Sequence, residues 1–270
     1  MGRLWKQIVA PLHPSRVGRR AFTLVELLVS LGVLGFLVGL ILPGLTKARR
    51  QAAGTYCQSG LRQIALVNEM YAREQRGHFV PGAADFLRNR HRWHGTRASL
   101  QAPFEGGDGP LRDYLGPGGD IRRCPALEVD KPGFEAGCGG YGYNNAYVGV
   151  VGLTDRQGRF LVLSDRAGTV ADRIRRPAET LMFADAAFVN GELIEYSFAE
   201  PRFHPRFQGR ADPSIHFRHL RRANVAWCDG HVSAESPTFY WKSGFYEGDP
   251  ADFEVGWFGE GDDNSDFDLD

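Results

Sequence analysis

The chain has 270 residues, with 32 basic and 32 acidic side chains. The charge is unevenly distributed, because residues 1–21 hold five basic and no acidic residues, whereas residues 247–270 hold ten acidic residues and no Lys or Arg. No internal repeat and no long low-complexity linker is found, which excludes a repeat architecture and leaves room for one ordinary domain beyond residue 75.

Residues 22–42 carry the strongest signal. Sixteen residues without a charge, 27–42, follow Glu26, and Pro43 comes next. A bilayer core is about 30 Å thick and a helix rises about 1.5 Å per residue, so residues 22–42 can cross a membrane once. A charge inside such a helix costs about 3 kcal/mol or more, so the carboxylate of Glu26 predicts a functional role.

This segment resembles the type IV prepilin signature, which pilins share with the pseudopilins of type II secretion. The matching features are a basic leader, the small Ala21, Phe22, the apolar run, Glu26 at the fifth position from Phe22, and Pro43 at the twenty-second. The family usually has glycine where Ala21 stands. The resemblance implies that a prepilin peptidase removes the leader, residues 1–21, and methylates the new amino group of Phe22.

The same resemblance implies a role for Glu26 in assembly. Its carboxylate would pair with the amine of Phe22 in a neighbouring subunit and set the register between packed helices, since an unpaired charge in apolar surroundings is costly. The implied partners are other pilin-like subunits, an inner-membrane assembly platform and membrane lipid. An ordinary membrane anchor and a secretory signal peptide are the alternatives, although the run lacks a small-x-small cleavage site after it.

Location follows from the leader motif rather than from charge. Basic residues lie on both sides of the span, so the positive-inside rule hardly decides the orientation. We expect a single-pass inner-membrane protein whose C-terminal domain is periplasmic or extracellular, or a subunit incorporated into a filament.

The residues after Pro43 continue a helical pattern. A stripe with a spacing of three or four residues runs through them, and Gly77 and Pro81 are expected to end the helix, which gives an N-terminal helix over 22–75. A globular domain is expected over 76–246, with short antiparallel strands near 141–151, 160–163, 181–185 and 192–198. The fold class is α+β, a long helix packed on an antiparallel sheet. The stripe consists of Cys57, Leu61, Ile64, Asn68 and Tyr71.

A hairpin is expected over 223–233, with Asp229-Gly230 in a two-residue type I′ turn. His219 precedes Asp229-Gly230 by nine residues, and this spacing resembles the His-x9-Asp-Gly motif of prepilin-type processing-associated proteins. Further matches are Cys57 with residues 61–64, Cys124-Pro125, residues 141–144 and residues 177–185. The resemblance implies a pseudopilin-like architecture. The sequence has no nucleophile elbow, phosphate loop or His-Glu-x-x-His motif, so we expect a non-enzymatic subunit. A hydrogen bond from His219 to Asp229 would hold the hairpin closed.

Four cysteines, Cys57, Cys124, Cys138 and Cys228, allow two disulfides in an oxidising compartment, and four free thiols are the alternative. No two have C-x-x-C spacing, which argues against zinc. The second resemblance favours pairing Cys57 with Cys124, which leaves Cys138 with Cys228.

Other site hypotheses are weaker. A membrane-tethered domain could bind a metal or hydrolyse a substrate through His216, His219, Asp229 and His231, with Asp185 from another strand end. Alternating oxygen ligands at Asp262, Asn264, Asp266 and Asp268 resemble calcium spacing, but a flexible acidic tail over 247–270 is the simpler interpretation. Basic residues in 202–222 are expected to be solvated rather than to bind nucleic acid. No cofactor is predicted.

Overall fold

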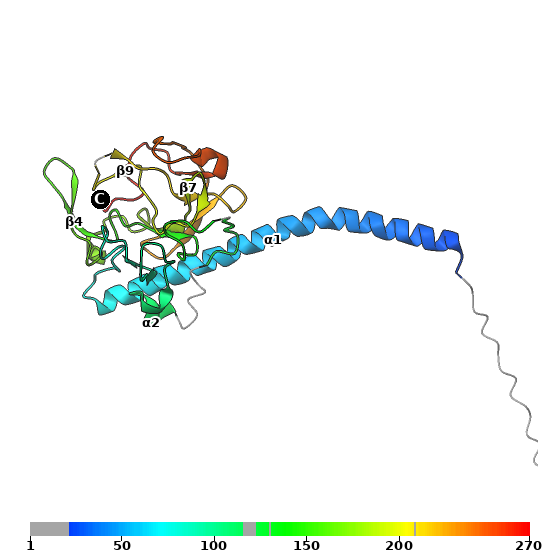
Figure 1. The fold of residues 1–270 in the computed structure, drawn as a ribbon, viewed down its shortest axis with the longest axis horizontal. Helices are drawn as coiled ribbons and strands as arrows, with labels where there is room; N and C mark the ends of the chain where they lie inside the picture. The colour runs from blue at the N-terminus through cyan, green and yellow to red at the C-terminus, as the bar shows by residue number, and fades with distance from the viewer. Residues whose placement is uncertain (1–21, 116–122, 130, 208) are drawn as a thin grey trace, which may run out of the picture. The chain divides into compact units, whose positions relative to one another are not determined.

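The computed structural model describes residues 22–115, 123–129, 131–207 and 209–270, so the predicted leader lies outside the described residues. Two compact units divide the chain, residues 1–46 and residues 47–270. One helix, α1 (Leu24–Glu74), has residues in both. Every described residue of the first unit is exposed, and the second unit contains the sheet and the core (Figure 1).

The second unit is built from short elements. The helical ones are η1 (Gly106–Asp108), α2 (Arg112–Leu115), η3 (Ala171–Arg173) and η4 (Pro250–Phe253). The strands are β1 (His91–Arg92), β2 (Gly95–Thr96), β3 (Tyr141–Tyr143), β4 (Val151–Thr154), β5 (Phe160–Ser164), β6 (Leu181–Asp185), β7 (Phe188–Asn190), β8 (Glu192–Ile194), β9 (Phe203–His204), β10 (Gly209–Arg210), β11 (Ile215–His216), β12 (Ala223–Trp227), β13 (Val232–Glu235) and β14 (Val255–Gly256).

The central sheet has the strand order β13-β12-β6-β3, and each neighbouring pair is antiparallel. Strands β6 and β12 are buried along their whole length, so they form the centre of the core. A long helix followed by an antiparallel sheet domain confirms the predicted α+β class. Two predicted strands are shorter than expected, because residues 145–150 form turns before β4 and β8 ends at Ile194.

The second half of α1 presents its predicted stripe to the core. Cys57, Leu61, Ile64 and Asn68 are fully buried, whereas Tyr71 is only half-buried. Asn68 explains how a polar residue is tolerated there: its amide donates to the Tyr143 hydroxyl on β3 at 3.2 Å and its carbonyl oxygen accepts from the Val80 backbone N–H at 2.9 Å.

The end of α1 follows the predicted signal. The Gly77 N–H donates to the Ala72 carbonyl at 2.8 Å, and Gly77 has φ +87°, a left-handed conformation that glycine adopts at little cost. The chain then turns back, and the Phe79 N–H donates to the Thr169 carbonyl at 3.0 Å.

The acidic tail differs from the expectation of a flexible terminus. Phe267 and Leu269 are buried in the core, and the Asn144 amide donates to the Phe267 carbonyl at 2.7 Å. The Leu181 N–H donates to the Asp266 carbonyl at 2.8 Å, and β14 pairs with β11. The segment is therefore part of the domain, because apolar side chains alternate with its acidic ones and fill the core beside β6.

Candidate functional site

The N-terminal end of α1 is organised by Thr23 and Glu26. The Glu26 carboxylate accepts from the Thr23 N–H at 2.9 Å and from the Thr23 hydroxyl at 2.9 Å, while the Glu26 N–H donates back to the Thr23 hydroxyl at 3.2 Å. This reciprocal pattern is a capping box, which satisfies backbone donors that a helix start leaves unpaired. Glu26 thus has a local structural role besides the one that the prepilin resemblance implies, and its Thr-x-x-Glu spacing with Thr23 is the sequence signal for it.

The first unit has the properties of a membrane segment. Within the described residues, α1 is the one helix that is long and apolar enough to cross a membrane. Its most apolar window of 18 residues has a mean hydropathy of 2.5, and no residue of that window is buried. It continues through Pro43, which supplies no N–H for the helical hydrogen bond to residue 39. Phe22 is exposed beside this helix, and Ala21 lies outside the described residues.

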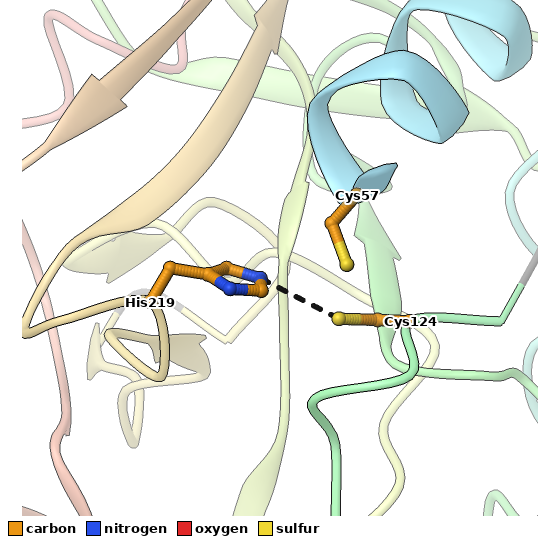
Figure 2. Close-up of side chains that lie close together, drawn as sticks. All are labelled: Cys57, Cys124 and His219. Atoms are coloured by element: carbon orange, nitrogen blue, oxygen red, sulfur yellow. Dashed lines mark hydrogen bonds between the residues drawn. The ribbon is translucent and has the colours of Figure 1, made fainter. Parts of the chain in front are cut away.

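A second site lies where α1 meets the sheet. Figure 2 shows the side chains of Cys57, Cys124 and His219 pointing toward one another from α1, from the segment before β3 and from the segment between β11 and β12. The two sulfur atoms and a His219 ring nitrogen all lie within 4.8 Å of one another. Cys124 Sγ is 3.5 Å from His219 Nε2, and all three residues are buried.

Asp185 and Arg218 complete the polar surroundings of this cluster. Asp185 Oδ2 lies 3.3 Å from His219 Nε2 and accepts from the Asn224 N–H at 2.7 Å. Arg218 Nη2 donates to Asp185 Oδ1 at 2.8 Å, and Arg218 Nε donates to Cys124 Sγ at 3.2 Å. A buried carboxylate and a buried guanidinium, paired with each other, therefore both contact the cluster.

These contacts shift the pKa values of the cluster. The hydrogen bond from Cys57, together with the charge of Arg218, lowers the pKa of Cys124 to about 4, while the same hydrogen bond and burial raise the pKa of Cys57. Burial lowers the pKa of His219, but hydrogen bonds to Asp185 and Cys124 outweigh it and raise that pKa to about 9. The folded domain thus favours a Cys124 thiolate beside a protonated imidazole.

A strained turn holds His219 in place. His219 and Arg222 exchange two backbone hydrogen bonds, at 3.0 and 3.1 Å, across Leu220 and Arg221. Both intervening residues have positive φ, 55° and 61°, as in a type I′ turn. Neither is glycine, so each costs about 1 kcal/mol or more, and such strain is concentrated at functional positions.

The predicted turn at Asp229-Gly230 differs from the expectation. Only Gly230 has positive φ there, and the Gly230 N–H donates to the Trp227 carbonyl at 3.0 Å. Together with the bond from the Trp227 N–H to the His231 carbonyl, this is a three-residue hairpin loop closed by a left-handed glycine. Asp229 bonds the N–H and ring of His231 and makes no contact with His219, whose partner is Asp185.

The proposed histidine cluster is therefore not assembled. His216 Nδ1 lies 3.2 Å from Arg218 Nη1, and burial with that positive charge lowers the pKa of His216 to about 3. Asp229 and His231 form a separate exposed pair at 2.7 Å. Of the four residues, only His219 joins a group with metal-ligand geometry in the described part of the chain.

The predicted calcium ligands are engaged inside the domain. Asp262 accepts from Arg210 at 2.6 and 2.9 Å, and Asn264 bonds the Tyr147 hydroxyl and the backbone of Phe203. Asp268 pairs with Arg176 at 3.8 Å. Burial raises the pKa of Asp266 to about 6. The predicted calcium ligands thus contact arginine side chains and backbone groups of the domain, including those of the arginine-rich stretch 202–222.

All four cysteines are free thiols in the structure, so neither expected disulfide is formed in it. Cys57 and Cys124, the pair that the family resemblance favours, do have sulfur atoms within 4.8 Å of each other. Cys138 lies near Glu195 and Glu135, whereas Cys228 lies near Asp229 and Glu69.

A buried polar network between β1 and the segment after β8 was not predicted. Arg92 and Glu135 form an ion pair at 2.7 Å with both side chains almost fully buried, and Ser197 links Glu135 to His94 Nε2. His94 is buried, although glycine and arginine residues flank it in the sequence. No local signal connects these residues, because their partners are about forty to one hundred positions away.

Comparison with known proteins supports the first of the two sites. Residues 16–42 match the model of the prokaryotic N-terminal methylation motif. No curated protein and no solved structure matches the chain.

Proposed function

We propose that this protein is a pilin- or pseudopilin-type subunit, cleaved between Ala21 and Phe22, anchored in the inner membrane by α1 and assembled through that helix. The observation that carries the proposal is the N-terminal methylation motif over residues 16–42, which leads into a 51-residue helix. In this view the partners are a prepilin peptidase, other pilin-like subunits, an assembly platform and lipid.

The exposure of α1 supports this role. Apolar side chains from Phe22 to Leu45 are exposed in the isolated chain; Phe22 is 76% and Phe36 68% exposed. So large an apolar surface is stable only in lipid or against other helices. The second half of the same helix is packed in a folded domain, so one element connects an apolar assembly segment to a polar unit.

Three arginines of the basic stretch 202–222 are engaged inside the domain. Arg202 is buried and donates to the Phe258 carbonyl at 2.6 Å, Arg218 is buried against Asp185, and Arg210 is paired with Asp262. These arginines serve contacts within the domain, and phosphate recognition would need accessible ones.

Mass spectrometry of the N-terminus in the native host tests the proposal. We expect a mature chain that begins at a methylated Phe22. Ala21→Glu should leave the precursor with 21 additional residues, because the small side chain before the cut is replaced by a larger charged one. Ala10→Glu, inside the leader but away from the cut, is the matched control and should be processed. Wild-type protein that keeps its leader would overturn the proposal.

A further inference from the structure

The Cys57–Cys124–His219 cluster lies outside residues 16–42, which carry the N-terminal methylation motif. We propose that it is a binding site for one zinc-type divalent metal ion, with Cys57 Sγ, Cys124 Sγ and His219 Nε2 as protein ligands. The ion would tie α1 to the segment before β3 and to the turn that precedes β12.

The distances fit such a centre. Zinc binds thiolate sulfur at about 2.3 Å and imidazole nitrogen at about 2.0 Å, so a tetrahedral ion places sulfur and nitrogen about 3.5 Å apart. Cys124 Sγ and His219 Nε2 are 3.5 Å apart, and Cys57 Sγ lies within 4.8 Å of both. All three side chains converge on one point in Figure 2.

The charges around the cluster fit a divalent cation. Once a bound metal has displaced the Cys57 proton, two thiolates and the Asp185 carboxylate carry three negative charges, and Arg218 supplies one positive charge. A divalent ion supplies the other two, which leaves the buried site neutral, as low-dielectric surroundings require. Asp185 Oδ2 lies 3.3 Å from the same histidine nitrogen and contributes its negative charge directly beside the cluster.

The outer contacts are also those of a prepared site. Arg218 Nε donates to Cys124 Sγ at 3.2 Å, and an N–H donor of this kind stabilises a metal-bound thiolate. The His219 ring packs against α1 at Gly54, and the strained turn at Leu220-Arg221 fixes its position. Both features orient ligands before an ion arrives.

Two hollows of the surface are lined by residues of the cluster. His219 lines a hollow of about 270 Å³ together with Gly54 and Thr55 of α1. Cys124 lines a second hollow of about 580 Å³ with Tyr56 and Leu127. The cluster thus combines buried ligands with solvent-facing approaches, as a site that exchanges metal needs.

Cobalt titration of the reduced full chain in detergent tests the proposal directly. Co²⁺ should bind with a stoichiometry of one per chain and produce a thiolate-to-cobalt charge-transfer band, and Zn²⁺ should abolish that band by displacing Co²⁺. Alkylation should modify Cys57 and Cys124 only after the metal is removed. Absence of the band in folded wild-type protein would overturn the proposal.

Variants assign the ligands. Cys57→Ser, Cys124→Ser and His219→Asn should each weaken Co²⁺ binding at least tenfold. Cys138→Ser and His216→Asn are the controls, since they remove a buried thiol and a neighbouring imidazole outside the cluster, and they should bind as wild type does. Equal weakening in the controls would contradict the assignment, and circular dichroism of each variant excludes misfolding as the cause.

Metal analysis of protein isolated from the host provides the second decision. We expect one zinc per chain and two alkylatable thiols at Cys57 and Cys124 after chelation. A Cys57–Cys124 disulfide in that protein, with no bound metal, would show that the cluster is a covalent crosslink instead. N-terminal processing is measured independently, so failure of the metal site leaves the proposed subunit function intact.

Discussion

Asp266 shows how a single acidic residue in residues 247–270 is used differently from its neighbours. Its carboxylate is only partly exposed, and burial raises its pKa to about 6. Asp262 is more exposed, and its hydrogen bond with Arg210 lowers its pKa. Ionisation of the two carboxyls therefore changes the stability of the fold in opposite directions, although the residues stand four positions apart in the same acidic segment.

Asp266→Asn should reveal this difference. A carboxyl whose pKa is higher in the folded than in the unfolded state destabilises the fold when both are ionised, so wild-type stability falls as pH rises from about 4 to about 6. The variant lacks this penalty and should gain on the order of 2 kcal/mol relative to wild type between pH 4 and pH 7. Denaturant unfolding of the full chain in detergent at both pH values measures the gain.

The control is Asp262→Asn. Its folded-state pKa is lowered, so the wild-type carboxylate stabilises the fold above its unfolded pKa and that stability is lost as pH falls through the folded pKa. The control variant should therefore lose stability relative to wild type as pH rises. A parallel response of the two variants would contradict the assignment for Asp266.

The residue types predicted some members of the candidate site but not which of them contact one another. His219 and Asp185 were both recognised as candidates, and the structure brings them within 3.3 Å. The predicted contact between His219 and Asp229 is wrong. It was inferred from their short distance in the sequence, whereas the pairing of strands determines which residue lies beside His219. Cys57 and Cys124 were paired through the family resemblance, but spacing alone cannot show that three distant segments supply one ligand set.

In the first turn of α1, one residue has two assigned roles. Glu26 belongs to a capping box with Thr23, and it is also the acid that the prepilin resemblance places at the assembly interface. Removal of the whole side chain would abolish both roles at once. A substitution that keeps the hydrogen-bonding shape and removes the charge distinguishes them.

Glu26→Gln and Glu26→Ala are therefore compared. Glutamine can close the capping box but cannot neutralise the amine of Phe22 in a neighbouring subunit. If the charge sets the register, both variants should insert in the membrane and both should fail to enter filaments, as measured by shearing and immunoblotting. Normal assembly of Glu26→Gln, together with failure of Glu26→Ala, would assign the residue to capping alone.

Other elements were predictable to different degrees. The stripe on α1 was found because one face of a long helix must be apolar to pack, and Gly77 marked its end because positive φ favours glycine. Residues 146–151 were expected to form a strand, but they are mostly turns, because Asn144 bonds the Tyr147 N–H and reverses the chain. A short apolar run cannot show whether side-chain hydrogen bonds bend its backbone.

The second unit, residues 47–270, depends as a whole on residues far apart in the chain. The core joins Cys57 on α1 to Phe267 and Leu269 in the acidic segment. The expectation of a solvated tail failed because net charge dominated the interpretation of residues 247–270, whereas the alternate apolar side chains carry the packing. Backbone hydrogen bonds from Arg175 and Leu181 to this segment, each at 2.8–2.9 Å, confirm that it is an integral part of the unit.

Phe267→Ala should destabilise this unit by about 3 kcal/mol, because it removes a buried ring and leaves a cavity. The matched control is Phe245→Ala, whose ring is 82% exposed and should change stability by less than about 0.5 kcal/mol. Tryptophan fluorescence during urea unfolding of the full chain in detergent measures both. A Phe267→Ala protein as stable as the control would show that the segment is not part of the core.

The distance between the two ends of this core has a consequence for biosynthesis. A ribosome adds about 10 residues per second, so Phe267 emerges about 20 s after Cys57. Throughout that interval α1 is already synthesised, while its sheet-facing stripe has no completed surface to cover it. The order of synthesis therefore completes the first half of α1 well before the core around Cys57 can close, and the buried face of α1 stays uncovered until the segment with Phe267 has been made.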